Sequence, residues 1–106
     1  MTNTHLTGTL QTFTDENFQT EVLASEVPVL VDFWADWCPP CQMLTPTIEQ
    51  VATSQTGSAV VGKLHVDENP KVASEYGVSS IPTVLVFKHG EVVERIVGVQ
   101  PRNKYE

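Results

Sequence analysis

A seven-residue run from Val29 to Ala35 places the strongest constraint on the fold of this chain. Its residues are apolar at odd and even positions alike, and Asp32 is its one charged side chain. A strand that faces solvent on one side alternates apolar and polar residues, whereas a strand covered on both faces is apolar throughout. The run therefore predicts a central strand with helices packed on both faces of its sheet. It also places Asp32 where an ionised carboxylate would be costly.

The flanking sequence contains the helices and strands that such a sheet needs. We expect strands at 10–13, 29–35, 59–66, 83–87 and 91–97, and helices at 14–24, from 38 to about 57, and from 70 to about 77. Thr14 is a good N-cap for the first helix, and Leu44, Ile48, Val51 and Ala52 mark the inner face of the second. Only three residues separate the last two strands, so they should form an antiparallel hairpin. The order βαβαβαββ predicts a single α/β domain over residues 1–106, with three layers around a mixed sheet.

Length and charge restrict what this domain can bind. The chain has 106 residues, which suffice for one core but not for two separate ones. With 13 acidic and 6 basic side chains its formal net charge is -7, which disfavours nucleic acid and anionic membrane surfaces as partners. No apolar run approaches the roughly 20 residues of a membrane span, and the first eight residues lack the features of a secretory signal. We therefore expect a cytoplasmic protein.

The two cysteines are the strongest chemical feature of the sequence. The segment Cys38-Pro39-Pro40-Cys41 lies where the central strand leads into the second helix. Side chains three residues apart in a helix are neighbours, so a disulfide can form and open there with little backbone movement. A thiol at the helix N-terminus faces free N–H groups and the positive end of the helix dipole, which favour its thiolate. We therefore expect Cys38 to be an exposed nucleophile and Cys41 a more buried, resolving thiol.

Two other interpretations of the cysteines stay open, a zinc site and a pair of inert buried thiols. Zinc ordinarily takes four ligands, and the remaining soft donors, His5, His65 and His89, are scattered along the chain, so no metal site is expected. Inert thiols would not explain why both cysteines fall at the start of a helix. His65 and His89 are instead expected to lie at the surface with no chemical task.

The sequence around the cysteines resembles the active-site segment of thioredoxins. The matching residues are Asp32-Phe33-Trp34-Ala35-Asp36-Trp37-Cys38, Pro40 and Cys41, then Pro46, Lys63, Ile81-Pro82-Thr83, Phe87-Lys88, Gly90 and Val97-Gly98, in the order of the family. The resemblance implies the thioredoxin fold and a protein-disulfide reductase that acts in redox homeostasis by dithiol–disulfide exchange. It also implies a redox-active disulfide, Cys38–Cys41, with no bound cofactor. Electrons would come from NADPH through a flavin-containing thioredoxin reductase, and the other partners would be client proteins with disulfides.

Residues outside the cysteine pair are expected to support this chemistry. Burial should raise the pKa of Asp32, which suits it to exchange a proton with Cys41, and Lys63 on the neighbouring parallel strand is the expected counter-charge. The alternatives are an Asp32 that reaches solvent at a strand edge and a Lys63 that is simply solvated. The expected client-binding residues are Trp37, Pro39, Pro40, Ile81, Pro82, Val97 and Gly98. The resemblance implies a cis bond before Pro82, which would present backbone groups beside Cys38 to an extended client segment. Phe33 and Trp34 are expected in the core.

The departures from the thioredoxin pattern include one between the cysteines and one at the C-terminus. Pro39 replaces the usual glycine after the first cysteine, and since proline has no N–H, Pro39 and Pro40 together remove two first-turn donors. Cys38 should then rely on the amide of Cys41 and those that follow. The second departure is the C-terminus, because only eight residues follow Gly98, enough for a truncated helix of about one turn. A sheet face that is partly bare, or covered by another molecule, would favour a monomer of low stability or a weak dimer.

Two alternative functions remain for the same fold. An oxidase or isomerase of an oxidising compartment would use the same chemistry. The first eight residues lack the features of a signal sequence. The pair between the two cysteines, Pro39-Pro40, is closer to Gly-Pro than to Pro-His. Both features favour a reductase over an oxidase or isomerase. A non-catalytic module that uses the fold as a binding scaffold would leave the cysteines idle. The presence of both cysteines, Asp32 and Pro82 argues against this scaffold.

Overall fold

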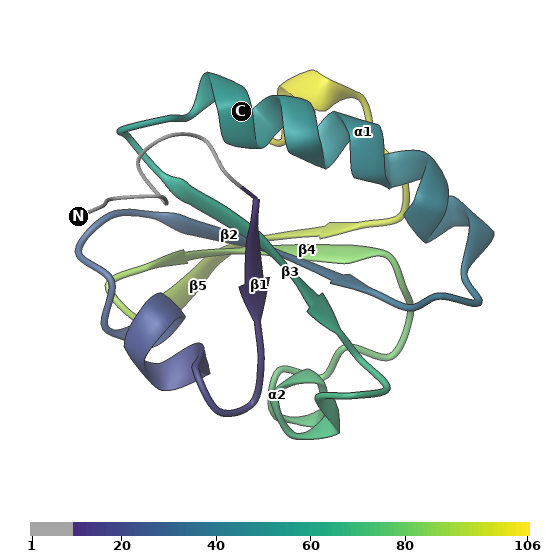
Figure 1. Ribbon diagram of the computed structural model, residues 1–106, viewed down its shortest axis with the longest axis horizontal. Coiled ribbons are helices and arrows are strands. Elements are labelled where there is room, and N and C mark those ends of the chain that lie inside the picture. The colour runs from purple at the N-terminus through teal and green to yellow at the C-terminus, as the bar shows by residue number, and fades with distance from the viewer. Residues whose placement is uncertain (1–9) are drawn as a thin grey trace.

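The computed structural model describes residues 10–106, and their elements follow the predicted order (Figure 1). The strands are β1 (Gln11–Phe13), β2 (Val29–Trp34), β3 (Val60–His65), β4 (Thr83–Lys88) and β5 (Glu91–Val97). The helical segments are η2 (Gln19–Leu23), α1 (Pro39–Ser54), α2 (Pro70–Glu75) and η3 (Arg102–Lys104). His5 and the N-terminal stretch tested for a signal sequence lie outside the described residues.

The five strands form one mixed sheet in the order β1-β3-β2-β4-β5. β1, β3 and β2 are parallel, whereas β4 is antiparallel to β2 and β5 is antiparallel to β4. β2 therefore lies at the centre, as its apolar sequence predicts, and every residue of it before Trp34 is buried. α1 and η3 lie on one side of the sheet and η2 and α2 on the other, which confirms the predicted three layers (Figure 1).

An apolar cluster lies on each face of the sheet. On the face covered by η2 and α2, Phe18, Val22 and Val72 pack with Leu64 and Leu85. On the face covered by α1, the cluster contains Leu30, Leu44, Ile48, Val51, Ala52, Val61, Val84, Ile96 and Tyr105. The predicted inner face of the second helix is therefore confirmed. Burial of these side chains provides the main driving force for packing the helices on the sheet.

The first helical segment differs from its prediction. The sequence predicts a helix from Thr14 to about Ala24, whereas η2 is a π-helix of five residues with Phe18 at its N-cap. Thr14 instead caps a turn before it, since its hydroxyl accepts from the Asn17 N–H at 3.1 Å and its own N–H donates to the Asn17 side chain at 2.7 Å. A segment this short has little helical stability of its own, so burial of Phe18 and Val22 decides its geometry.

The C-terminal tail is held in place by Tyr105, a role that the sequence does not predict. The predicted single turn is present, but η3 is a 3-10 helix rather than an α-helix. Tyr105 is buried against the α1 side of the sheet, and only 5% of it is exposed. Its hydroxyl accepts from the Gln100 N–H at 3.1 Å and donates to the Gly98 carbonyl at 3.4 Å. A buried aromatic ring with a satisfied hydroxyl thus holds a segment that is too short to be stable alone.

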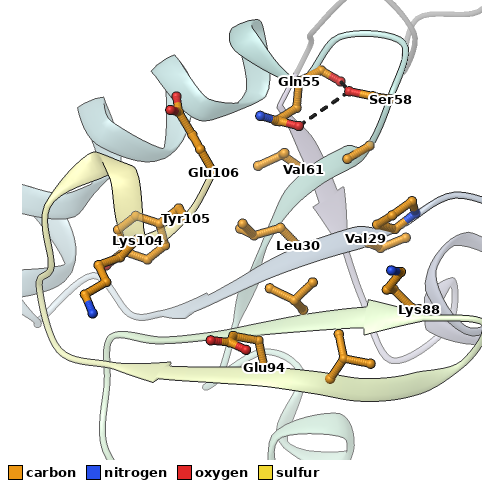
Figure 2. Close-up of a pocket in the computed structure, with 14 residues that line it drawn as sticks. Val29, Leu30, Gln55, Ser58, Val61, Lys88, Glu94, Lys104, Tyr105 and Glu106 are labelled. Carbon is orange, nitrogen blue, oxygen red and sulfur yellow. Dashed lines mark hydrogen bonds between the residues drawn. The ribbon is translucent and has the colours of Figure 1, made fainter.

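A cavity of about 390 Å³ remains on this face beside the tail (Figure 2). Its apolar lining includes Leu30, Val61, Val86, Val93 and Tyr105. The polar residues Glu94, Lys104 and Glu106 also line it. The face is therefore partly bare, as the short C-terminus predicts, although Tyr105 covers part of it.

Candidate active site

The two cysteines form a disulfide at the N-terminus of α1. Their Cα atoms are 5.2 Å apart. Cys38 is the N-cap of the helix, Pro39 and Pro40 fill its first two positions, and Cys41 follows in the same turn. The Cys41 N–H donates to Cys38 Sγ at 3.2 Å. Cys41 provides the first amide that the two prolines leave available, so the predicted reliance of Cys38 on this donor is confirmed.

The sulfur atoms are less accessible than the sequence predicts. Cys38 is 3% exposed and Cys41 is 1% exposed, so the predicted contrast between an exposed and a buried thiol is wrong for the disulfide state. Bonding to Cys41 directs the Cys38 sulfur inward, where the Ile81 carbonyl oxygen lies 3.8 Å away and Ala35 packs against the pair. The difference that remains is one of position, because Cys38 caps the helix and Cys41 lies within its first turn.

The loop before β4 lies directly against the disulfide. The Ile81–Pro82 bond is cis, as the resemblance to thioredoxins implies. The Pro82 carbonyl accepts from the Gly98 N–H at 2.8 Å, which joins this loop to the residue after β5. Gly98 has a φ of +83°, a left-handed conformation that glycine adopts readily. Ile81, Pro82 and Gly98 are thus brought together on the Cys38 side of the site.

The other expected client-binding residues are exposed. Trp37 is 65% exposed and Val97 is 50% exposed, while Pro39 and Pro40 are also exposed. The Trp37 indole N–H donates to Asp67 Oδ2 at 2.7 Å, from the turn that follows β3. This hydrogen bond fixes the orientation of the Trp37 indole ring. Nothing in the sequence singles out Asp67 as the residue that does so.

Asp32 is fully buried at the centre of β2. It lies in register with Lys63 of β3 and Val84 of β4. Neither carboxyl oxygen has a hydrogen-bond partner among the described residues. Burial raises the pKa of Asp32 from 3.8 to about 7, and the charge of Lys63 lowers it by less than burial raises it. The predicted rise is confirmed, and the alternative of an Asp32 that reaches solvent is wrong.

Lys63 is a strand neighbour of Asp32, but its ammonium group lies against α1 and Trp34. The ammonium nitrogen donates to Thr45 Oγ1 at 3.1 Å and lies 4.1 Å from the centre of the Trp34 ring. The Thr45 hydroxyl donates in turn to the Cys41 carbonyl at 3.2 Å. Within residues 10–106, no ion pair joins Lys63 to Asp32. Lys63 is therefore more than a solvated strand residue, and Thr45 is a site residue that the sequence does not reveal.

His65 and Trp34 differ from their predictions. The His65 side chain is only 12% exposed, its Nε2 lies 3.0 Å from Asp36 Oδ2, and its ring packs edge-on against Trp34. Trp34 is half-buried rather than fully buried: it packs against the cluster of Ala35, Cys38 and Cys41, and the polar side chains of Lys63 and His65 lie against its ring. Phe33 is fully buried and His89 is exposed, as expected.

The titratable side chains of residues 10–106 include no group of three His, Cys, Asp or Glu that could hold a metal ion. Over the same residues, no helix has both the length and the apolar character needed to cross a membrane. The sulfur pair and the buried carboxyl support chemistry in which a disulfide opens, exchanges partners and closes again.

A disulfide that closes within the first turn of a helix, after a central strand of an α/β sheet, is typical of proteins that exchange thiols for disulfides. Comparison with known proteins gives the family. The thioredoxin family model matches residues 9–106. Thioredoxin of Chlorobaculum thiosulfatiphilum is 58% identical over 90 residues, which cover 85% of this chain and 83% of that protein. Thioredoxin 2 of Chlorobaculum tepidum is 54% identical with the same coverage, and thioredoxin of Rickettsia felis is 51% identical over 85% and 86% of the two chains. The chain belongs to the thioredoxin family.

Membership of this family and the Cys38–Cys41 disulfide together identify a protein thiol–disulfide oxidoreductase. Thioredoxins are protein-disulfide reductases that act in redox homeostasis, and their working group is a redox-active disulfide. The fold expected from the resemblance is confirmed with it.

Proposed function

We propose that Cys38-Pro39-Pro40-Cys41 is the active site of a disulfide reductase in which Cys38 attacks and Cys41 resolves. The observation that supports this assignment is the hydrogen bond from the Cys41 N–H to Cys38 Sγ. In the reduced protein, the same donor and the positive end of the α1 dipole would stabilise a Cys38 thiolate. Cys41 lies three residues further along the first turn of α1, where the helix dipole acts on it less.

The proposed reaction has two covalent steps. The Cys38 thiolate attacks one sulfur of a client disulfide, forms a mixed disulfide and releases the other client sulfur as a thiolate, which takes a proton from solvent. Cys41 then gives its proton to Asp32 and attacks the Cys38 sulfur, which releases the second client sulfur as a thiolate. The client gains two electrons, and the Cys38–Cys41 disulfide forms again. A flavin-containing thioredoxin reductase would return the pair to the dithiol with electrons from NADPH.

Asp32 is proposed as the proton acceptor in the second step. A buried carboxyl group whose pKa is about 7 can accept a proton and release it again near neutral pH, which a carboxyl group with an ordinary pKa cannot do efficiently. Lys63 is proposed as its counter-charge, since it is the cross-strand neighbour whose charge lowers that pKa.

Clients are proposed to bind as extended segments along the Ile81–Pro82 loop. Cys38 Sγ lies against the Ile81 carbonyl, so a segment placed there would bring its disulfide to the nucleophile. The remaining contacts are assigned to Trp37, Pro39, Pro40, Val97 and Gly98. The exposed apolar surface of Trp37 and Val97 would be buried by the client, which supports binding without a charge requirement.

The proposal places this activity in a single domain over residues 1–106, in the cytoplasm. The net charge of -7 supports protein clients rather than nucleic acid or an anionic membrane surface. The domain would act as a monomer or a weak dimer, because the cavity beside Tyr105 leaves only a limited apolar surface for association. Its partners are disulfide-containing clients and thioredoxin reductase.

Reduction of insulin by dithiothreitol, followed as turbidity, tests the assignment. The wild-type protein should accelerate the reaction, and Cys38→Ser should reduce the rate to that of dithiothreitol alone. Cys41→Ser that is reduced and then separated from dithiothreitol before it meets insulin should accumulate mixed disulfides on non-reducing gels, because the second step is blocked. Equal rates for the wild type and Cys38→Ser would instead support a scaffold with idle cysteines. NADPH consumption with a bacterial thioredoxin reductase would test the electron source.

A further inference from the structure

The position of the Lys63 ammonium group is unexpected for a residue beside a buried carboxyl group. Asp32 and Lys63 face each other in the register of β2 and β3, and both Asp32 oxygens lack a hydrogen-bond partner in the described part of the chain. The ammonium nitrogen is nevertheless placed against Thr45 and the Trp34 ring. An opposite charge is thus held near Asp32 without forming the ion pair that would stabilise its carboxylate.

Thr45 is well suited to hold this ammonium group. Its hydroxyl has one proton, which it donates to the Cys41 carbonyl one turn back at 3.2 Å. The oxygen lone pairs then remain free to accept from Lys63 at 3.1 Å. The bond to Cys41 fixes the orientation of the Thr45 hydroxyl. The backbone of α1 therefore determines where the lone pairs that accept from Lys63 lie.

Contact with water also favours this position. Lys63 and Trp34 line a cavity of about 290 Å³, whereas Asp32 is fully buried. An ammonium group beside Thr45 keeps a route to solvent. Moved onto Asp32, it would lose that hydration, although the ion pair would offset part of the loss.

We propose that Thr45 is a positioning residue for the second step of the exchange: its hydroxyl holds the Lys63 ammonium against α1 and so keeps the Asp32 carboxyl group unpaired. This inference rests on the roles proposed above for Asp32 and Lys63. An unpaired, buried carboxylate has a high affinity for a proton, which it takes from the Cys41 thiol. An Asp32 paired with Lys63 would stay ionised and would be a weaker base.

The other groups around Asp32 leave Lys63 as the main electrostatic control. From β4 the register neighbour is Val84, which is apolar. Tyr105, next to η3, interacts with the charge of Asp32, but burial raises its pKa further above 10, so it is neutral near pH 7. From α1, Cys41 does not titrate while the disulfide is closed. The charge of Lys63 already lowers the pKa of Asp32, and this effect grows as the distance shortens.

The decisive measurement is an NMR titration of the Asp32 carboxyl carbon in the oxidised protein. The proteins compared are the wild type, Thr45→Val, Lys63→Met and the double variant. Thr45→Val should lower the Asp32 midpoint by about one pH unit, because the released ammonium moves toward the carboxylate. Lys63→Met should raise the Asp32 midpoint both in the wild type and in the Thr45→Val protein. The rise should be larger by about one pH unit in the Thr45→Val protein.

Either of two results would overturn the proposal. One is an Asp32 midpoint that stays the same or rises in Thr45→Val. The other is a Lys63→Met shift of equal size in both backgrounds, which would show that Thr45 does not set the position of the ammonium group. Thr45→Ala provides a second variant if Val is poorly accommodated.

Thr53→Val is the matched control. Thr53 lies in the same helix and its hydroxyl makes the same type of bond, to the Glu49 carbonyl at 3.2 Å, whereas the hydrogen bond that the Lys63 ammonium makes within residues 10–106 is to Thr45. Its substitution should leave the Asp32 midpoint unchanged. The titration needs no turnover, so it can fail while Cys38→Ser remains inactive with insulin, and then only the role of Thr45 is refuted. Insulin reduction by Cys38→Ser would refute the proposed function whatever the titration gives.

Discussion

Asp32 should make the stability of the oxidised protein depend on pH, and the Asp32→Asn substitution should remove this dependence. Burial raises the pKa of Asp32 to about 7 in the folded protein, whereas the unfolded chain keeps a value near 3.8. Between these values the folded protein binds one more proton than the unfolded chain. The contribution of Asp32 to the free energy of unfolding therefore falls as the pH rises from about 4 to about 7, and this contribution is constant above that range.

The size of the effect follows from the same two pKa values. They differ by about three pH units, each worth about 1.4 kcal/mol, so ionisation of Asp32 should destabilise the folded protein by about 4 kcal/mol at pH 8. Small domains have a total stability of only about 5–15 kcal/mol, so this is a large share. Asparagine has nearly the same shape and no charge at any pH. Asp32→Asn should thus match the wild type near pH 4 and exceed it by up to about 4 kcal/mol at pH 8.

Urea denaturation of the oxidised proteins from pH 4 to pH 9, at constant ionic strength, measures this difference. The difference in unfolding free energy between Asp32→Asn and the wild type should grow by about 1.4 kcal/mol per pH unit and level off above pH 7. Glu68→Gln is the control, since Glu68 is exposed, and its curve should run parallel to that of the wild type. Parallel curves for Asp32→Asn as well would refute the reasoning, because they would mean that folding does not change the proton affinity of Asp32.

Two further predictions concern the tail and the first turn of α1. Tyr105→Ala should lower the free energy of unfolding by about 3–5 kcal/mol, because it removes a buried aromatic ring, whereas Tyr105→Phe should cost about 1 kcal/mol for the hydrogen bonds with Gly98 and Gln100. Urea denaturation would measure both, and full stability of Tyr105→Ala would contradict the role of the ring as an anchor. Pro39→Gly should lower the pKa of Cys38 in the reduced protein by a few tenths of a pH unit, because it restores an N–H at the positive end of the helix. Thiolate absorbance against pH would measure this, and a lower pKa in the Pro39 protein would show that ring packing outweighs the missing donor.

The sheet could be predicted from the sequence because its strongest signals are local. The run that is apolar on both faces places β2 at the centre, and the short connection after β4, which is His89-Gly90 in the structure, specifies the hairpin with β5. The buried position of Asp32 follows from the same run. The proximity of the two cysteines at the helix start follows from their spacing, since it depends only on neighbours along the chain.

The features that could not be predicted depend on contacts between distant segments or on the redox state. Thr45 and Lys63 are 18 residues apart, and nothing in either local sequence marks them as partners. Tyr105 reaches the α1 side of the sheet from a tail that has no helical periodicity. The inaccessible Cys38 sulfur reflects the closed disulfide, and a sequence alone does not specify whether the two thiols are bonded.

Thr45, Lys63 and Asp32 connect the stability of the fold with the chemistry of the site. Pairing Lys63 with Asp32 would stabilise the ionised carboxylate, but it would also lower the proton affinity that the second step needs. Holding the ammonium on Thr45 keeps that affinity and leaves the folded protein less stable above neutral pH. If this account holds, Thr45→Val changes both properties together: as the Asp32 midpoint falls, the loss of stability with rising pH must shrink by about 1.4 kcal/mol for each pH unit of the fall. A lower midpoint without the smaller loss would break this linkage and show that the substitution also lowers the pKa of Asp32 in the unfolded chain.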